Sequence, residues 1–152
     1  MTDHRYYADA TWTEGRKGTV AAKGIAETIF FSAPPEFMGE SGVWTPEHFL
    51  TAAIASCFVT TFKAIAEFSK FEFLSLKAEV EAVLEKEQGG YRFTRIIVRP
   101  VLEIAAVADQ ERAIRLLEKA ERGCLISRSL NSAMELDPVV LISSPERVET
   151  TK

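Results

Sequence analysis

The sequence contains few of the residues that bind metals or form structural disulfides. Its 152 residues include two histidines and two cysteines, Cys57 and Cys124. The two cysteines lie far apart in the chain, and no C-x-x-C spacing occurs. A structural zinc site needs four clustered nitrogen or sulfur ligands, which this set supplies poorly. We therefore expect neither a metal site nor another bound cofactor.

Basic clusters and an apolar leader are also missing. The 18 lysines and arginines are scattered, and the formal net charge is −4. This distribution argues against binding to nucleic acid or to an anionic membrane surface. The first residues, Met-Thr-Asp-His-Arg, lack the apolar run of a signal peptide. We therefore expect a cytoplasmic protein whose two cysteines are reactive thiols and not a permanent disulfide.

The most informative stretch runs from Thr45 to residue 67. Thr45 is a good helix N-cap, and Pro46 suits the first helical position. No charged side chain occurs from Phe49 to Phe62, and apolar residues surround the helix on all sides, which predicts a buried central helix. The uncharged part is shorter than the roughly 20 apolar residues that span a bilayer. Burial inside protein is therefore expected, and Cys57 lies in the middle of this helix.

The other elements predict an α+β fold in a single domain, residues 1–152, with antiparallel sheets packed around the central helix. Alternating apolar residues predict strands, and Pro100 should break or bend one of them. The strands are expected at 5–13, 19–22, 25–31, 71–84, 93–104 and 138–142, and residues 143–152 should form a frayed tail. The long uncharged helix needs more cover than one small sheet provides, which favours a homodimer.

A second helix and the second cysteine follow the long hairpin. Asp109 should cap an amphipathic helix that runs to Glu121 and ends at Gly123. A short helical segment, 125–130, should begin at Cys124. A cysteine at a helix N-terminus gains from free amides that lower its pKa. From the residues alone, Cys124 is thus the more acidic thiol, while Cys57 lies mid-helix and has the properties of an inert buried thiol.

Three motifs, however, resemble the OsmC/Ohr family of thiol peroxidases. They are Trp12-x-x-Gly15-Arg16-x-Gly18, Thr45-Pro46-Glu47-x-x-Leu50-x-Ala52-Ala53-x-Ala55-x-Cys57, and Cys124-x-x-Ser127. The resemblance extends from about Tyr6 to Ile142.

The resemblance implies an intertwined homodimer that reduces organic hydroperoxides. It implies that Cys57 is the peroxidatic thiolate, that Cys124 is the resolving thiol, and that Arg16 and Glu47 are the activating pair. A thiolate attacks the O–O bond, becomes a sulfenic acid, and condenses with a second thiol to a disulfide. An external dithiol, in this family often a lipoyl-bearing protein, then reduces the disulfide by exchange.

The activating pair also has a physical basis and a geometric difficulty. A mid-helix thiolate needs a nearby cation, and a guanidinium stays charged when desolvated. Glu47 could hold Arg16 by a bidentate contact, although Lys17 leaves the choice of cation open. Ten helical residues separate Glu47 from Cys57 by roughly 15 Å. Either Glu47 serves the partner chain, or the helix begins with an irregular turn.

The surroundings of Cys57 suggest a substrate class, and two other functions remain open. As a set near Cys57, aromatic and apolar residues would favour alkyl or lipid hydroperoxides, although each one taken singly is more typical of a core residue. They are Phe37, Met38, Trp44, Phe49, Phe58 and Phe62. One alternative function is a non-catalytic protein that binds an apolar ligand or partner. The other is a hydrolase in which His48, roughly 13 Å from Cys57 along the helix, would be the base.

Overall fold

The computed structural model describes residues 2–143, which form two compact units. The N-terminal unit is Met1–Leu50 and the C-terminal unit is Thr51–Lys152, with the boundary inside the central helix. The expected frayed tail, apart from Ser143, lies outside the described residues.

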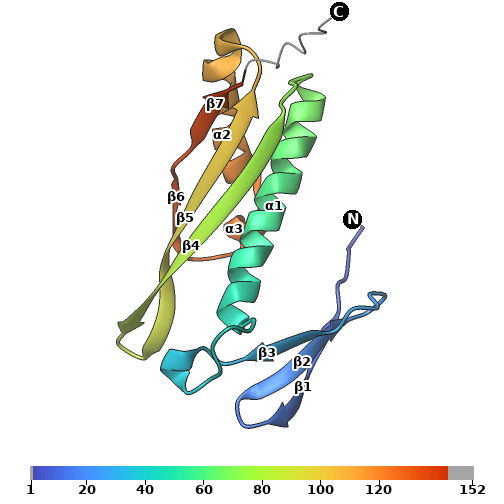
Figure 1. Cartoon of the computed structure of the whole chain (residues 1–152), viewed down its shortest axis with the longest axis vertical. Helices are drawn as coiled ribbons and strands as arrows, with labels where there is room; N and C mark the ends of the chain where they lie inside the picture. Colours follow the sequence, from blue (N-terminus) through green and yellow to red (C-terminus); the bar gives the residue numbers. More distant parts are fainter. Residues whose placement is uncertain (1, 144–152) are drawn as a thin grey trace, which may run out of the picture. The chain divides into compact units, whose positions relative to one another are not determined.

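The N-terminal unit contains the antiparallel meander that the sequence predicts. Strand β1 (Ala8–Glu14) pairs with β2 (Lys17–Ala22), which pairs with β3 (Ile29–Ser32) (Figure 1). Gly15 adopts a φ of 51° at the tip of the first hairpin, a conformation that glycine adopts without a steric penalty. The loop after β3 contains one short 3₁₀ helix, η1 (Pro35–Phe37).

The central helix α1 (Pro46–Phe68) starts where the sequence predicts. The Thr45 hydroxyl accepts a hydrogen bond from the His48 amide at 3.2 Å and so caps the helix. The prediction of burial on all sides is wrong for a single chain, because only one face, with residues at intervals of four, is buried. That face consists of Ile54, Phe58, Phe62 and Ala66. By length and composition the whole helix could also cross a membrane, a property that core helices of soluble proteins share.

A mixed four-stranded sheet forms the framework of the C-terminal unit. Strands β4 (Ser75–Glu87) and β5 (Gly90–Ile104) form the expected antiparallel hairpin. Strands β6 (Ala133–Leu136) and β7 (Val139–Ile142) both pair with β5 in parallel, which corrects the prediction of an antiparallel sheet. The chain leaves the end of β5, crosses over through helices, and returns in the same direction. The short β6, with no β-branched residue, was not predicted.

Pro100 does not break its strand, so the predicted break is wrong. Strand β5 continues through it to Ile104. On the parallel side, β5 pairs with β6 as far as Val98 and with β7 from Val101 onward. Pro100, which has no amide hydrogen to donate, lies between these two ladders. The gap is therefore where a proline costs the sheet least.

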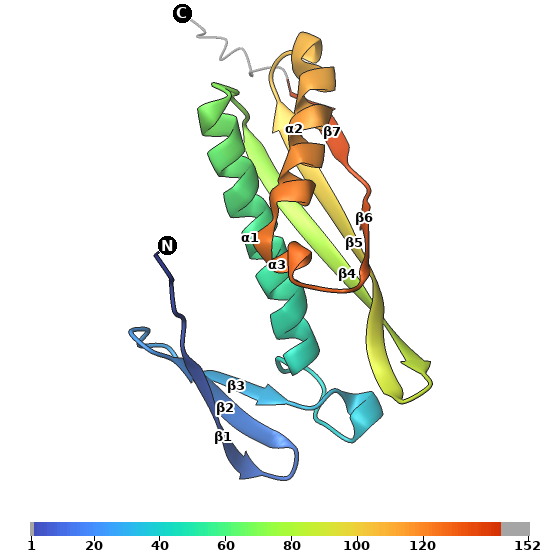
Figure 2. The same cartoon turned by 180° about the vertical axis from the view of Figure 1, so that it is seen from behind.

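The helices of this unit cover one face of the sheet. Figure 2 shows α2 (Gln110–Gly123) and α3 (Leu125–Arg128) on the same face as α1. A 3₁₀ turn, η2 (Val107–Asp109), precedes α2, but the Asp109 side chain makes no capping hydrogen bond. The predicted apolar face of α2 is confirmed, since its members are buried: Ala113, Leu116, Leu117 and Ala120.

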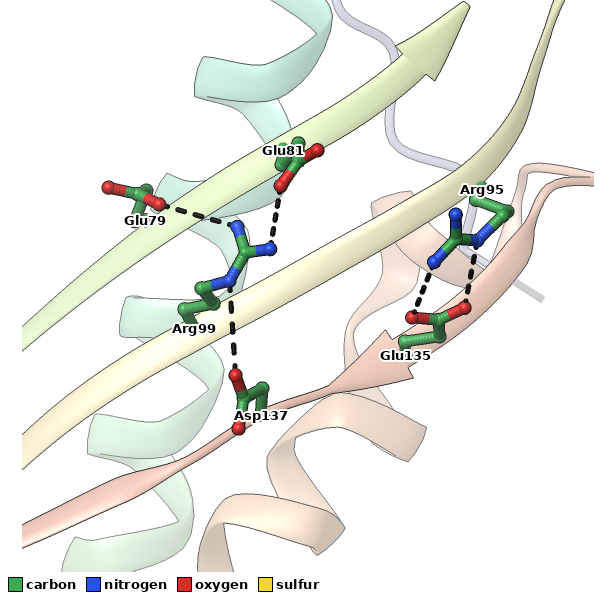
Figure 3. Close-up of polar contacts among 6 residues, drawn as sticks. All are labelled: Glu79, Glu81, Arg95, Arg99, Glu135 and Asp137. Carbon is green, nitrogen blue, oxygen red and sulfur yellow. Dashed lines mark hydrogen bonds and ion pairs between the residues drawn. The ribbon is translucent and has the colours of Figure 1, made fainter.

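The opposite face of the sheet carries ion pairs. Arg99 on β5 contacts Glu81 at 2.6 Å and Glu79 at 3.4 Å, and it lies 3.9 Å from Asp137 (Figure 3). Arg95 pairs with Glu135 at 3.0 Å. One apolar and one charged face is the pattern of a sheet with one side in water. Both cysteines belong to the helical layer that covers the apolar side of the sheet.

Candidate functional site

The C-terminal unit brings Cys57 and Cys124 together, although 66 residues separate them. Cys57 projects from α1, and Cys124 lies between α2 and α3. Both are free thiols, and each affects the pKa of the other. A Cβ atom built on Gly123 would lie 3.6 Å from Cγ2 of Thr61, so the chain just before Cys124 passes directly beside α1.

Hydrogen-bond donors surround the sulfur of Cys57. Partial burial raises the pKa of this thiol, but donors outweigh that effect and lower its pKa overall. They are the Ile126 amide, the Cys124 thiol, the Thr61 hydroxyl at 3.8 Å and the Leu125 amide. The two amides belong to the first turn of α3. The expectation that Cys57 has no helix terminus available is therefore wrong, because it uses that of a neighbouring helix.

The environment of Cys124 has the opposite effect. Burial raises the pKa of this thiol, which is 1% exposed, and hydrogen bonding and charge from Cys57 raise it further. The Ser127 hydroxyl, 3.4 Å from Sγ, and the Ser127 amide lower the pKa without cancelling the rise. The prediction that Cys124 is the more acidic thiol is thus wrong. Of the two thiols, Cys57 is therefore the one whose pKa the surroundings lower.

Arg16 and Lys17 have different partners in the N-terminal unit. Arg16 Nη1 donates to the Phe37 carbonyl at 2.6 Å, and no ion pair involves Arg16 within residues 2–143. Lys17 Nζ pairs with Glu40 at 2.7 Å and lies 3.9 Å from Glu14. Carboxylates thus neutralise the charge of Lys17, whereas no carboxylate among the described residues neutralises that of Arg16.

Glu47 is the second residue of α1, and its Oε2 atom is buried without a hydrogen-bond partner among the described residues. Within one chain, Arg16 and Glu47 do not form the expected bidentate contact: no ion pair joins them among the described residues. The helix begins regularly at Pro46, so the irregular turn is not observed. A buried carboxylate oxygen without a hydrogen-bond partner is costly to the folded state.

Arg16 and Glu47 belong to the N-terminal unit, and the cysteines belong to the C-terminal unit. The convergence of all four side chains on one site therefore stays a prediction.

The aromatic residues fall into two groups. Phe58 and Phe62 are 1% and 0% exposed, so they are core residues and do not line an approach to the thiol. Trp44, by contrast, is half-exposed and stacks on Phe49 with ring centroids 5.7 Å apart. Together with Gly42, Val43 and His48, it lines a cavity of about 450 Å³ in the N-terminal unit.

Thr61 and Ser127 lie beside the two cysteines, and neither was predicted to take part in the chemistry. Thr61 was not predicted, although its position one helical turn after Cys57 puts it on the same face of α1. Ser127 was noted only as part of a motif. His48, the base of the hydrolase alternative, contacts the Thr45 hydroxyl at 2.9 Å in the helix cap.

The opposite pKa shifts of the two cysteines predict their order of alkylation. At pH 7 to 8, iodoacetamide should modify Cys57 before Cys124, because the thiolate is the reactive form. Thr61→Val removes a donor to the Cys57 thiolate, so it should raise the pKa of Cys57 and shift its pH profile of alkylation upward. Peptide mass spectrometry after timed alkylation would measure both rates. Faster modification of Cys124 would contradict the assignment.

Comparisons with known proteins identify the family and agree with the fold. The family model described as OsmC-like protein matches residues 39–138. The uncharacterized protein YmaD of Bacillus subtilis is 32% identical over 141 residues, which cover 90% of this chain and 93% of that protein. Peroxiredoxin OsmC of Escherichia coli is 26% identical and covers 80% of this chain and 84% of its own length.

A solved structure extends the comparison to the fold. An organic hydroperoxide resistance protein from Elizabethkingia anophelis superimposes with a TM-score of 0.75 at 20% identity. The superposition covers 93% of this chain and 99% of that one. The resemblance of the motifs is thus confirmed by the family match and by the shared fold. The chain belongs to the OsmC-like family.

Proposed function

We propose that this protein is a thiol-dependent peroxidase that reduces organic hydroperoxides to alcohols. The observation that carries the proposal is the paired cysteine site, in which the surroundings lower the pKa of the half-buried Cys57 thiol and raise the pKa of its buried neighbour Cys124. A peroxidatic cysteine must be a thiolate to attack, and its partner must be close enough to condense with the product. The names of the relatives, peroxiredoxin and organic hydroperoxide resistance protein, support the same chemistry.

The proposed cycle has three steps. The Cys57 thiolate attacks the terminal oxygen of the hydroperoxide, the O–O bond breaks, and the alkoxide takes up a proton to leave as an alcohol. The Cys57 sulfenic acid then reacts with Cys124, which forms the S–S bond and releases water. An external dithiol reduces this disulfide through a mixed disulfide and is itself oxidised. A lipoyl-bearing protein is one such dithiol, and a reducing cytoplasm would suit the free thiols.

Arg16 and Glu47 are the proposed activating pair. The Arg16 guanidinium would stabilise the Cys57 thiolate and the negative charge that develops on the peroxide oxygen. Glu47 has a buried oxygen without a hydrogen-bond partner among the described residues, which supports the proposal that an arginine of a second subunit binds this carboxylate. Lys17 is a weaker candidate because Glu40 already neutralises it.

A homodimer would supply this second subunit and cover the exposed sides of α1. The helix has no charged residue from Phe49 to Phe62, yet only one of its faces is buried by its own chain. A twofold partner that packs against the other faces would remove this apolar surface from water. An organic hydroperoxide is the proposed substrate, as the name of the similar organic hydroperoxide resistance protein suggests.

Equimolar cumene hydroperoxide should oxidise both cysteines of the reduced protein and lower its intact mass by about two mass units as the disulfide forms. Cys57→Ser should abolish the reaction, whereas Cys124→Ser should stop at a sulfenic acid that dimedone traps. Stopped-flow fluorescence of Trp12 and Trp44 would give the rates, with hydrogen peroxide as the comparison substrate. If the wild type keeps both thiols, the protein is a binder and not a peroxidase.

Arg16→Ala should lower the second-order rate constant for cumene hydroperoxide by roughly 100-fold, the usual loss when a charge-stabilising donor is removed. Lys17→Ala is the matched control and should change that rate less than threefold, because its charge is already paired. Competition with a reference thiol measures both constants. Equal losses of rate in the two variants would show that Arg16 is not the specific catalytic cation.

Multi-angle light scattering should give twice the chain mass of 16.9 kDa at micromolar concentration. Val59→Glu, a charge placed on a partly exposed apolar position of α1, should shift the mass toward the monomer, because burying an unpaired charge is costly. Lys63→Glu, an exposed position on the same helix, is the control. A wild-type protein of monomer mass would refute the dimer.

A further inference from the structure

Ser127 is one of the few polar residues buried in the described part of the chain. It is 4% exposed and is the third residue of the four-residue helix α3. Its hydroxyl donates a hydrogen bond to Sγ of Cys124 at 3.4 Å. Cys124 is itself 1% exposed, so water does not compete effectively for this contact.

The direction of this hydroxyl differs from that of other serines in the helices of the chain. Ser56 and Ser129 turn back to carbonyl oxygens four residues earlier, Ala52 and Leu125, as helical serines commonly do. Ser127 points to a sulfur instead. A neutral thiol is a weak acceptor. A thiolate, however, accepts a charge-assisted bond that is roughly twice as strong, so the contact stabilises mainly the ionised form of Cys124.

Cys124 carries negative charge at two points of the proposed cycle. It does so when it attacks the Cys57 sulfenic acid and when the disulfide is cleaved at Cys57. Cys57 is half-buried, whereas Cys124 is almost completely covered. An incoming dithiol therefore reaches the sulfur of Cys57, forms the mixed disulfide there, and displaces Cys124 as the leaving thiolate.

We propose that Ser127 is a positioning residue for the resolving thiol, whose hydroxyl stabilises the Cys124 thiolate both as attacker and as leaving group. The inference rests on the proposed peroxidase function and adds a residue to it. Cys57 is the titratable group that faces Cys124 from α1, and it receives its own donors from Thr61 and the α3 amides. Ser127 should therefore affect the second and third steps of the cycle and leave the first step unchanged.

The test compares Ser127→Ala with Ser129→Ala, a neighbouring serine whose hydroxyl contacts only the Leu125 carbonyl among the described contacts. In stopped-flow fluorescence, Ser127→Ala should form the sulfenic acid within twofold of the wild-type rate. Disulfide formation should be about tenfold slower at pH 7, and its pH profile should shift upward. Ser127→Thr, which keeps the hydroxyl, should restore most of the rate, and Ser129→Ala should match the wild type.

A second measurement separates this inference from the peroxidase proposal. Diamide forms the Cys57–Cys124 disulfide without any peroxide, and dithiothreitol then reduces it. Reduction should be about tenfold slower in Ser127→Ala and in Ser127→Gly, a second variant without the hydroxyl. Unchanged reduction rates would overturn the inference even if the wild type reacts rapidly with peroxide. An equal slowing of all three steps, which a purely structural defect produces, would also overturn it.

Discussion

The site depends on the hydrogen bonds that Cys57 receives from the start of α3. A thiol in the middle of a helix has no free amides of its own, because each is already bonded within the helix. The Leu125 and Ile126 amides supply what α1 cannot. The Cys124 thiol also lowers the pKa of Cys57, whereas burial raises the pKa of Cys124 itself. The surroundings thus shift the pKa values of the two thiols in opposite directions.

The sheet and its crossover place these groups. Strand β5 ends, α2 and α3 cross one face of the sheet, and β6 returns beside β5 in parallel. Leu117 and Ala120 of α2 are fully buried, as are Ile54 and Phe58 of α1, so both helices are fixed by one core. Gly123 lies close enough to Thr61 that a larger residue would contact it. The segment with Cys124 is thereby held beside Cys57.

Two features of the chain have no partner in the described residues. Several faces of α1 are uncharged yet partly exposed, and Glu47 has a buried oxygen without a hydrogen-bond donor. A single arrangement, a second copy packed on α1 with an arginine near Glu47, would satisfy both. Arg16 fits this role because its described contact is a carbonyl group and not a carboxylate. The same constraint would then build the substrate site and the dimer together.

Local signals in the sequence were sufficient for much of the fold. The Thr45 cap and Pro46 set the start of α1, the alternation of residues set the long hairpin, and the apolar period set the buried face of α2. These features depend on residues close together in the chain. The family, and with it the choice of Cys57 and Cys124, also followed from short motifs.

The acidity of the thiols was decided by contacts that no local pattern contains. Sequence reasoning gave the helix N-terminus to Cys124, the adjacent residue, but the folded chain directs the α3 amides at Cys57 from another helix. The parallel pairing of β6 and β7 and the core positions of Phe58 and Phe62 likewise result from long-range packing. The sequence thus specified which residues could do the chemistry. Tertiary structure assigned the charge between them, because a pKa depends on the groups that surround a sulfur in space and not on its neighbours in the chain.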